Sequence, residues 1–183
     1  MINSPDKRWY ALRVFKNRLP LVKRQVEDAG NETYQAVKTA PALSGDKIKS
    51  KTVPLIPALL FVRVTETYVT QLKRERYDQL MVYGDVQGRP EPIDDAQMDV
   101  FILITSPGGG CEVDYLPDGE ELYKKGDPVK VTGGFYRGAT GVVKRIKKDR
   151  KLLVAIEGVA VVAVSNIPIE FIQKLPSAAE VKK

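Results

Sequence analysis

The chain has 183 residues, enough for one ordinary domain or two small ones, and its 43% hydrophobic and 28% charged content is typical of globular proteins. It has no histidine and one cysteine, Cys111, which excludes Ser–His and Cys–His catalytic pairs, His-ligated zinc and an intrachain disulfide. We find no phosphate-loop motif and no paired-carboxylate constellation, so we expect no catalytic residue, no metal and no cofactor.

The net charge of +6 is unevenly distributed along the chain. Residues 7–51 carry 11 basic and 4 acidic side chains, and residues 144–151, "KRIKKDRK", carry 6 basic and 1 acidic. Such patches attract polyanions by releasing condensed counterions, although a solvated surface that only keeps the protein soluble explains each patch equally well. No apolar run approaches the roughly 18 residues of a membrane helix, and no signal core precedes Trp9, so we expect a cytoplasmic protein without membrane contact.

The first quarter of the chain predicts a strand followed by a helix. The segment "RWYALRV", residues 8–14, is aromatic and β-branched, as strands are, while Pro20 and Gly30 are suitably placed to begin and end a helix. The apolar stripe of that helix consists of Leu21, Val22, Val26 and Ala29. A weaker strand is predicted over 33–39. Residues 40–53 are small, polar and basic, which predicts an exposed loop.

The second quarter continues the alternation of strands and helices. Pro57 delays pairing, so the apolar run "ALLFVRV" predicts a buried strand after it. Thr65 is a suitable N-cap for a helix, and "LMVYG" is a short strand. A third helix begins at Asp94 or Asp95. Its apolar face is predicted to consist of Met98, Phe101, Ile102 and Thr105.

The second half of the chain begins with a break in this pattern. Residues 106–110 contain one proline and three consecutive glycines, which indicates a flexible joint rather than a phosphate-binding loop. Beyond it the hydrophobic period changes to two, and five short strands separated by glycine and Asp/Lys turns predict a small SH3-like barrel. The β-branched run "LLVAIEGVAVVAV" favours strands over helices, and the glycines permit turns and sharp bends.

In this order, the segments resemble those of NusG-type transcription elongation factors along nearly the whole chain. "RWYALRV" is similar to the family's opening strand, "LIPALLFVRV" to the segment leading into its central strand, and "GRPEPIDDAQMDVF" to its Arg-Pro-x-Pro-Ile stretch. "GDPVKVTGGFYRGATGVVKRI" matches the KOW motif at Gly126, Val129, Val131, Gly134, Gly138, Gly141, Val143 and Ile146. The finer resemblance is to the UpxY group, antiterminators of capsular-polysaccharide operons, with RfaH as a functional cousin.

The resemblance implies an α+β protein with two domains. An NGN domain, an α/β sandwich with an antiparallel sheet, is expected over 7–106, a flexible linker over 107–123, and an SH3-like KOW β-barrel over 124–176. The NGN domain of this family grips the β′ clamp helices of RNA polymerase, bridges the nucleic-acid channel and suppresses pausing. The KOW domain recruits a further partner, for which a ribosomal or regulatory protein is expected. We expect a monomer.

The resemblance also carries polymerase-binding roles onto residues of this chain. The expected contact residues are Trp9, Tyr10, Ile56, Pro57, Leu59, Phe61, Tyr83 and Met98. For Trp9 and Phe61 a place in the domain core explains the residue equally well, whereas Ile56 and Leu59, beside Pro57, favour an apolar pocket. The family usually has aromatic residues where Ile56 and Leu59 stand, so contacts with the partner helices must differ in detail.

Two further sets of residues receive expected roles. Non-template DNA of the transcription bubble is expected to contact Lys16, Arg18, Lys23 and Arg24. The partner of the KOW domain is expected to contact Phe135, Tyr136 and Glu157. Glu157 stands where the general factor often has a bulky hydrophobe that helps to hold Rho or a ribosomal protein, and a charge is unfavourable at an apolar contact. We therefore expect this protein not to recruit Rho.

Two other functions stay open on the sequence alone. A generic nucleic-acid or ribosome-binding module is the first, because KOW barrels also occur in ribosomal proteins, and an enzyme with an SH3-like tail is the second. An apolar pocket within residues 54–105 distinguishes the first alternative, because simple RNA binders need none. The absence of histidine and of any catalytic cluster counts against the second.

Overall fold

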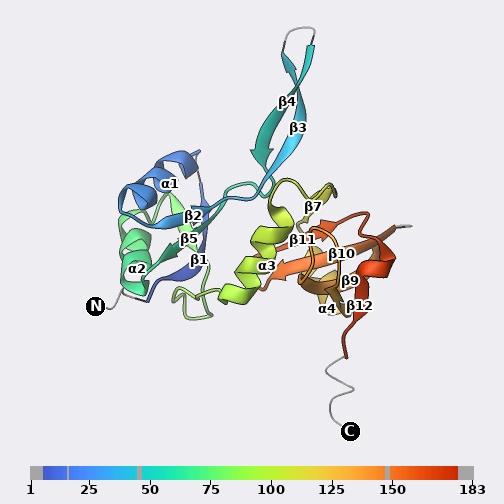
Figure 1. Ribbon diagram of the computed structural model, residues 1–183. Coiled ribbons are helices and arrows are strands. Elements are labelled where there is room, and N and C mark those ends of the chain that lie inside the picture. Colours follow the sequence, from blue (N-terminus) through green and yellow to red (C-terminus); the bar gives the residue numbers. More distant parts are fainter. Residues whose placement is uncertain (1–5, 16, 45–46, 147–148, 177–183) are drawn as a thin grey trace. The chain divides into compact units, whose positions relative to one another are not determined.

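The computed structural model describes residues 6–15, 17–44, 47–146 and 149–176 (Figure 1). The chain divides into two compact units, one made of Met1–Ala36 with Ile56–Met98 and the other of Val37–Leu55 with Asp99–Lys183. The expected class, a mixed α/β protein with antiparallel sheets, is confirmed. The domain boundaries inferred from the sequence are a separate division of the chain and stay a prediction.

The first unit is built on a four-stranded antiparallel sheet with the order β2-β5-β1-β6. Its strands are β1 (Arg8–Val14), β2 (Glu32–Tyr34), β5 (Leu59–Val64) and β6 (Leu80–Val82), and its helices α1 (Leu19–Asp28) and α2 (Glu66–Glu75). Both helices pack on one face of the sheet, where Tyr10, Leu12 and Val62 form a core with Val22 and Val69. The predicted strand at 8–14, the strands after Pro57 and at β6, and both helices are therefore confirmed, whereas the weaker strand predicted over 33–39 is divided between β2 and a strand of another sheet that begins at Val37.

The buried face of α1 is narrower than the sequence predicted, and the predicted cap of α2 is present. In α1 only Val22 and Val26 of the predicted stripe are buried, whereas Leu21 and Ala29 are exposed. A helix that meets the sheet along a narrow line buries one residue per turn, so the stripe is thinner than predicted. In α2 the predicted cap is confirmed, because the Thr65 hydroxyl oxygen accepts a hydrogen bond from the Tyr68 amide at 3.2 Å.

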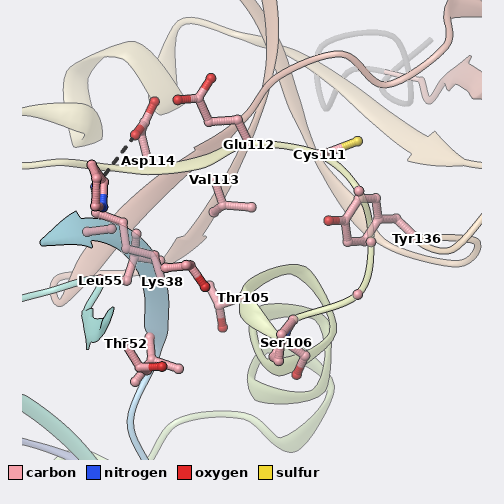
Figure 2. Close-up of a pocket in the computed structure, with 18 residues that line it drawn as sticks. Lys38, Thr52, Leu55, Thr105, Ser106, Cys111, Glu112, Val113, Asp114 and Tyr136 are labelled. Atoms are coloured by element: carbon pink, nitrogen blue, oxygen red, sulfur yellow. Dashed lines mark ion pairs between the residues drawn. The ribbon is translucent and has the colours of Figure 1, made fainter. Parts of the chain in front are cut away.

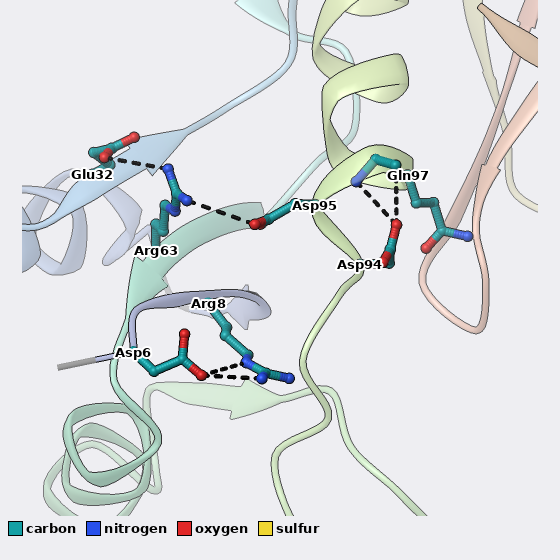
Figure 3. Close-up of polar contacts among 8 residues, drawn as sticks. Asp6, Arg8, Glu32, Arg63, Asp94, Asp95 and Gln97 are labelled. Carbon is teal, nitrogen blue, oxygen red and sulfur yellow. Dashed lines mark hydrogen bonds and ion pairs between the residues drawn. The ribbon is translucent and has the colours of Figure 1, made fainter. Parts of the chain in front are cut away.

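The helix α3 spans Asp95–Thr105. The sequence left open whether Asp94 or Asp95 is its N-cap residue. The carboxylate of Asp94 accepts hydrogen bonds from the amides of Ala96 at 3.0 Å and Gln97 at 3.2 Å, so Asp94 is the cap (Figure 3). Its buried residues are Met98, Phe101, Ile104 and Thr105. Ile104 thus replaces the predicted Ile102, which is only half-buried.

The second unit contains a β-hairpin where the sequence predicted an exposed loop. Strands β3 (Val37–Ser44) and β4 (Lys47–Pro54) pair antiparallel along their whole length. Figure 1 shows them as a two-stranded ribbon. Leu43 and Ile48, paired across the ribbon, are 83% and 77% exposed. The sequence prediction was wrong because main-chain pairing forms this ribbon without a buried face, and hydrophobic alternation is what reveals a strand.

A six-stranded antiparallel sheet with the order β12-β8-β9-β10-β11-β7 forms the rest of the second unit. Its strands are β7 (Val113–Leu116), β8 (Asp127–Val131), β9 (Thr140–Ile146), β10 (Asp149–Ile156), β11 (Ala160–Val164) and β12 (Ile172–Lys174). The five strands predicted after the glycine run are all present. The structure adds β7, which pairs with β11, and α4 (Gly119–Lys124); the segment expected to be a linker contains β7 and all of α4 except its last residue. Across the described residues, the helices are too short and polar to span a membrane.

Candidate functional site

The sheet of the first unit has a second face, opposite α1 and α2. Successive residues of a strand point to opposite faces, and directly paired residues of antiparallel strands share a face. Trp9 pairs with Arg63, Ala11 with Phe61, and Arg13 with Leu59. Because Tyr10 belongs to the helix-covered core, Trp9, Leu59 and Phe61 together lie on the opposite face.

The predicted polymerase-binding residues do not form one surface. They lie on different faces of the sheet, and most of them are buried. Tyr10 is separated from the others by the sheet. On the other face Trp9, Leu59 and Phe61 are buried. Ile56 and Met98, which lie outside the strands of the sheet, are buried as well. Only Pro57, which is exposed, and Tyr83, which is half-buried, reach the surface.

The sequence analysis missed one exposed apolar residue on the same face. Met81 of β6 pairs with Arg13 of β1, which places it on the face that carries Trp9, and it is 42% exposed. The signal was present in the alternation of "LMV", because Leu80 and Val82 are both buried under the helices. Only a known sheet order reveals that Met81 belongs with residues so distant in sequence.

Main-chain hydrogen bonds hold Trp9 in place, and two ion pairs lie on the neighbouring strand. The Ile93 amide donates a hydrogen bond to the Trp9 carbonyl oxygen at 2.8 Å. Beside it, the Arg63 guanidinium lies 3.8 Å from the Glu32 carboxylate and 3.7 Å from that of Asp95 (Figure 3). These partly exposed ion pairs contribute about 0.2–1 kcal/mol each and tie the first turn of α3 to β5.

The predicted nucleic-acid-binding residues surround α1. Arg18 precedes the helix and is exposed, whereas Lys16 lies outside the described residues. The Lys23 ammonium is 3.9 Å from the Glu27 carboxylate, and the Arg24 guanidinium is 3.6 Å from that of Asp28. Each predicted helix cation is therefore paired with an acid one turn later, which lowers the positive potential of this surface.

A stronger basic surface lies on the β3–β4 ribbon. Lys49 pairs with Ala42, Lys51 with Ala40, and Lys38 with Val53, so these three lysines share one face. Neither strand contains an acidic residue, so Lys49 and Lys51 have no acidic neighbour on the strands of the ribbon, while Lys38 lies 3.9 Å from Asp114 of another strand. Sequence reasoning noted the positive charge of this segment but not its concentration on one face, because a loop has no faces.

The predicted KOW partner residues are only partly brought together. Phe135 is 50% exposed, and its ring meets the buried Tyr136 ring edge-on, with the ring centroids 5.2 Å apart. Both line an apolar hollow of about 290 Å³ together with Phe171. Glu157 is exposed and lies outside the lining of that hollow. A Cβ atom added at Gly109 would overlap the Tyr136 ring, so this glycine allows close packing.

A larger hollow of about 550 Å³ also lies in the second unit (Figure 2). It is bordered by the base of the β3–β4 ribbon, the end of α3 and the glycine run. The Lys38 ammonium and the Asp114 carboxylate, 3.9 Å apart, form an ion pair at its edge. Burial raises the pKa of the Cys111 thiol, which keeps this residue in its unreactive form. Within the described ranges, no group of His, Cys, Asp and Glu is arranged to hold a metal ion.

Comparison with known proteins decides the family. The model of the family described as "Transcription termination factor nusG" matches residues 7–102. The chain belongs to the NusG family. NusG proteins are transcription factors that act with RNA polymerase during elongation, and they are not enzymes.

One similar solved structure is described as "Domain interaction in Thermotoga maritima NusG". It shares 20% sequence identity with this NusG protein, covers 93% of this chain and 98% of its own, and superposes with a TM-score of 0.47. Comparison with curated proteins gives no match.

Proposed function

We propose that this NusG protein holds RNA polymerase through the second face of the first sheet, which docks on the β′ clamp helices. The observation that carries the proposal is Met81, an apolar side chain on that face that is 42% exposed. Trp9, Leu59 and Phe61 form its buried layer, and Met81 and Pro57 are exposed beside it. Amphipathic helices bind such a face because burial of apolar surface contributes about 25 cal/mol per Å².

The residues predicted from the sequence have two different roles in this interaction, contact with the polymerase and support of the contact residues. Met81, Pro57 and Tyr83 make the contact, since they reach the surface, and the buried residues hold these three in position. Ile56 and Leu59 are buried, so substituting them tests folding before it tests binding. Tyr10 is left out of the contact because it packs under α1 and α2.

We assign contact with the non-template DNA strand to the lysine face of the β3–β4 ribbon and to Arg18. The ribbon lysines Lys49 and Lys51 have no acidic neighbour on their own strands, whereas Lys23 and Arg24 are paired along α1. Helix ion pairs of this exposed kind contribute only about 0.3–0.5 kcal/mol, so phosphates can replace the acids. Lys23 and Arg24 therefore remain secondary contacts in the proposal.

The finer assignment is a specialised antiterminator of the UpxY and RfaH kind. It acts in the cytoplasm and reduces pausing and termination during the transcription of polysaccharide-biosynthesis operons. It rests on the sequence resemblance and on Glu157, an exposed charge where the general factor has a hydrophobe. Rho is then not recruited. The hollow beside Phe135 is the proposed seat for a ribosomal or regulatory partner of the monomeric protein.

Single-round transcription on a template with a pause site and a Rho-dependent terminator tests this function. Addition of the protein is expected to shorten the pause and to increase read-through. Met81→Glu is expected to lose both effects. Val86→Glu is expected to keep them, because Val86 is an apolar residue that is 98% exposed but lies outside the strands of the sheet. Unchanged pausing and termination with the wild-type protein would overturn the proposal. Nucleic-acid binding without any effect on the polymerase would instead favour the generic KOW module, which the ribbon lysines also suit.

A further inference from the structure

A polar cleft of about 610 Å³ lies in the first unit, on the helix side of the sheet. Its walls are the start of β1, the first turn of α2 and the loop of residues 85–92. Pro90 and Pro92 restrict the backbone of the loop wall. The Asp85 carboxylate accepts hydrogen bonds from the amides of Gln87 and Arg89, both at 2.9 Å, so this wall is preformed.

The ring of Tyr10 is buried, and its hydroxyl group opens into this cleft. Tyr10 is 2% exposed and lines the cavity, yet among the described residues its hydroxyl has no hydrogen-bond partner. Burial raises its pKa, the Glu66 charge raises it further, and Arg8 and Asp6 act more weakly. Because these three charged residues all line the cleft, the hydroxyl end of the ring lies there and stays protonated.

The charges of the cleft do not balance. The Arg8 guanidinium is 3.0 Å from the Asp6 carboxylate, and that of Arg89 is 2.8 Å from Asp85, so both arginines are neutralised by neighbouring acids. Glu66 and Glu91 also line the cleft, and within the described part of the chain neither has an ion-pair partner. Two carboxylates and one hydroxyl oxygen of the cleft are therefore left without a cationic partner among the described residues.

We propose that this cleft binds an arginine side chain presented by a short segment of a partner protein. A guanidinium offers several N–H donors in one plane, which suit two carboxylates and a phenol oxygen at once. The volume lies in the range of small-ligand sites, so it admits one such side chain with its flanking backbone. The site lies across the sheet from Trp9 and is independent of the polymerase-binding face.

Titration of the full-length, isotope-labelled protein with acetyl-Gly-Arg-Gly-amide, followed by NMR amide shifts, tests this site. The expected shifts are centred on Arg8–Tyr10, Glu66 and residues 85–92. Two control peptides replace the arginine by lysine or by citrulline. The lysine peptide is expected to bind more weakly, because an ammonium group cannot bridge both carboxylates. The citrulline peptide has the same shape but no charge, and it is expected to produce no saturable shift. Equal binding of the arginine and citrulline peptides, or shifts centred elsewhere, would overturn the inference.

Variants assign the binding to named groups. Glu66→Gln and Glu91→Gln are each expected to weaken the arginine peptide about two- to fivefold, as partly exposed charge pairs do. Tyr10→Phe keeps the ring and removes only the oxygen, and it is expected to lower affinity with unchanged folding. Glu120→Gln in the second unit removes the same charge elsewhere and is expected to bind like the wild type. If the Glu66→Gln, Glu91→Gln double variant bound as tightly as Glu120→Gln, the assignment would be wrong.

Discussion

Trp9 and Tyr10 are adjacent in β1 and face opposite sides of the first sheet. Tyr10 packs in the core beneath α1 and α2, whereas Trp9 lies on the face shared with Phe61. The sequence resemblance treats the two as one aromatic pair with one role. The structure gives each its own surface, an apolar face on the Trp9 side and a polar cleft on the Tyr10 side.

The two adjacent aspartates at the start of α3 are expected to differ in their effect on stability. Asp94→Ala removes the acceptor of two backbone amides and is expected to lower the free energy of unfolding by about 1 kcal/mol. Asp95→Ala removes only a partly exposed ion pair with Arg63, so a loss below about 0.5 kcal/mol is expected. Urea unfolding of both variants measures the difference. Equal losses would contradict the capping role of Asp94.

The Asp85 carboxyl is expected to titrate below its ordinary pKa of 3.8. A hydrogen bond from the Arg89 amide lowers this pKa most. Burial, the next largest effect, raises it, and the Arg89 side chain and the Gln87 amide lower it further. Because the pKa is lower in the folded state, Asp85 stabilises the protein above its unfolded pKa, and that contribution is lost as the pH falls through the folded value. Carboxyl-carbon NMR measures it.

Arg89→Ala separates the two contributions to this shift. The variant keeps the backbone amide, so the pKa of Asp85 is expected to rise toward the ordinary value without reaching it. A pKa that did not move would show that the Arg89 guanidinium has no influence on the carboxylate. The variant Arg74→Ala, a basic residue of α2, provides the control.

Gly141 of the KOW motif is expected to tolerate no side chain. A Cβ atom there would overlap the backbone carbonyl oxygen of Leu153 on the neighbouring strand, which cannot move aside as a side chain can. Gly141→Ala is therefore expected to lower the stability of the second unit by about 1–3 kcal/mol. The adjacent exposed Thr140→Ala is expected to change it by less than about 0.5 kcal/mol. Thermal unfolding compares them, and equal midpoints would refute the steric role.

Binding to bubble DNA is expected to depend more on the ribbon than on α1. The Lys49→Gln, Lys51→Gln double variant is expected to weaken binding and to reduce the salt slope by about one for each lysine. Lys23→Gln, Arg24→Gln is expected to change the slope less, because both cations already have acidic partners. Fluorescence anisotropy at several salt concentrations measures the slopes. If the salt slope changed more for the Lys23→Gln, Arg24→Gln variant than for the ribbon variant, the DNA contact would lie on α1 and the assignment to the ribbon would be wrong.

Apolar and β-branched runs between turn residues predicted most of the fold because most elements bury at least one face. The strand at residues 8–14 and the helix that Thr65 caps both bury apolar residues, as do the strands after the glycine run. The β3–β4 ribbon does not, since both of its faces are exposed, and so it reads as a loop. Strand β7 was missed because residues 113–116 pair with β11, a partner that short-range patterns cannot indicate.

The sequence predicted which residues belong to the candidate site better than it predicted which of them are exposed. The resemblance selected Trp9, Leu59 and Phe61, which do share a face, but it could not distinguish a buried layer from an exposed contact. That distinction depends on what surrounds each side chain in three dimensions. Met81 and the lysine face were missed for a related reason, because the sheet order and the strand register assign them to a surface.

Affinity for RNA polymerase is the most direct test of the central claim, that the second face of the first sheet is the docking surface. Immobilised core polymerase is titrated with the wild-type protein, Met81→Glu and Val86→Glu, after thermal unfolding has verified that all three fold alike. The account predicts that Met81→Glu weakens binding about tenfold or more, as loss of an apolar anchor does, while Val86→Glu stays within about twofold of the wild type. Equal affinity of all three proteins, or equal losses in both variants, would contradict it.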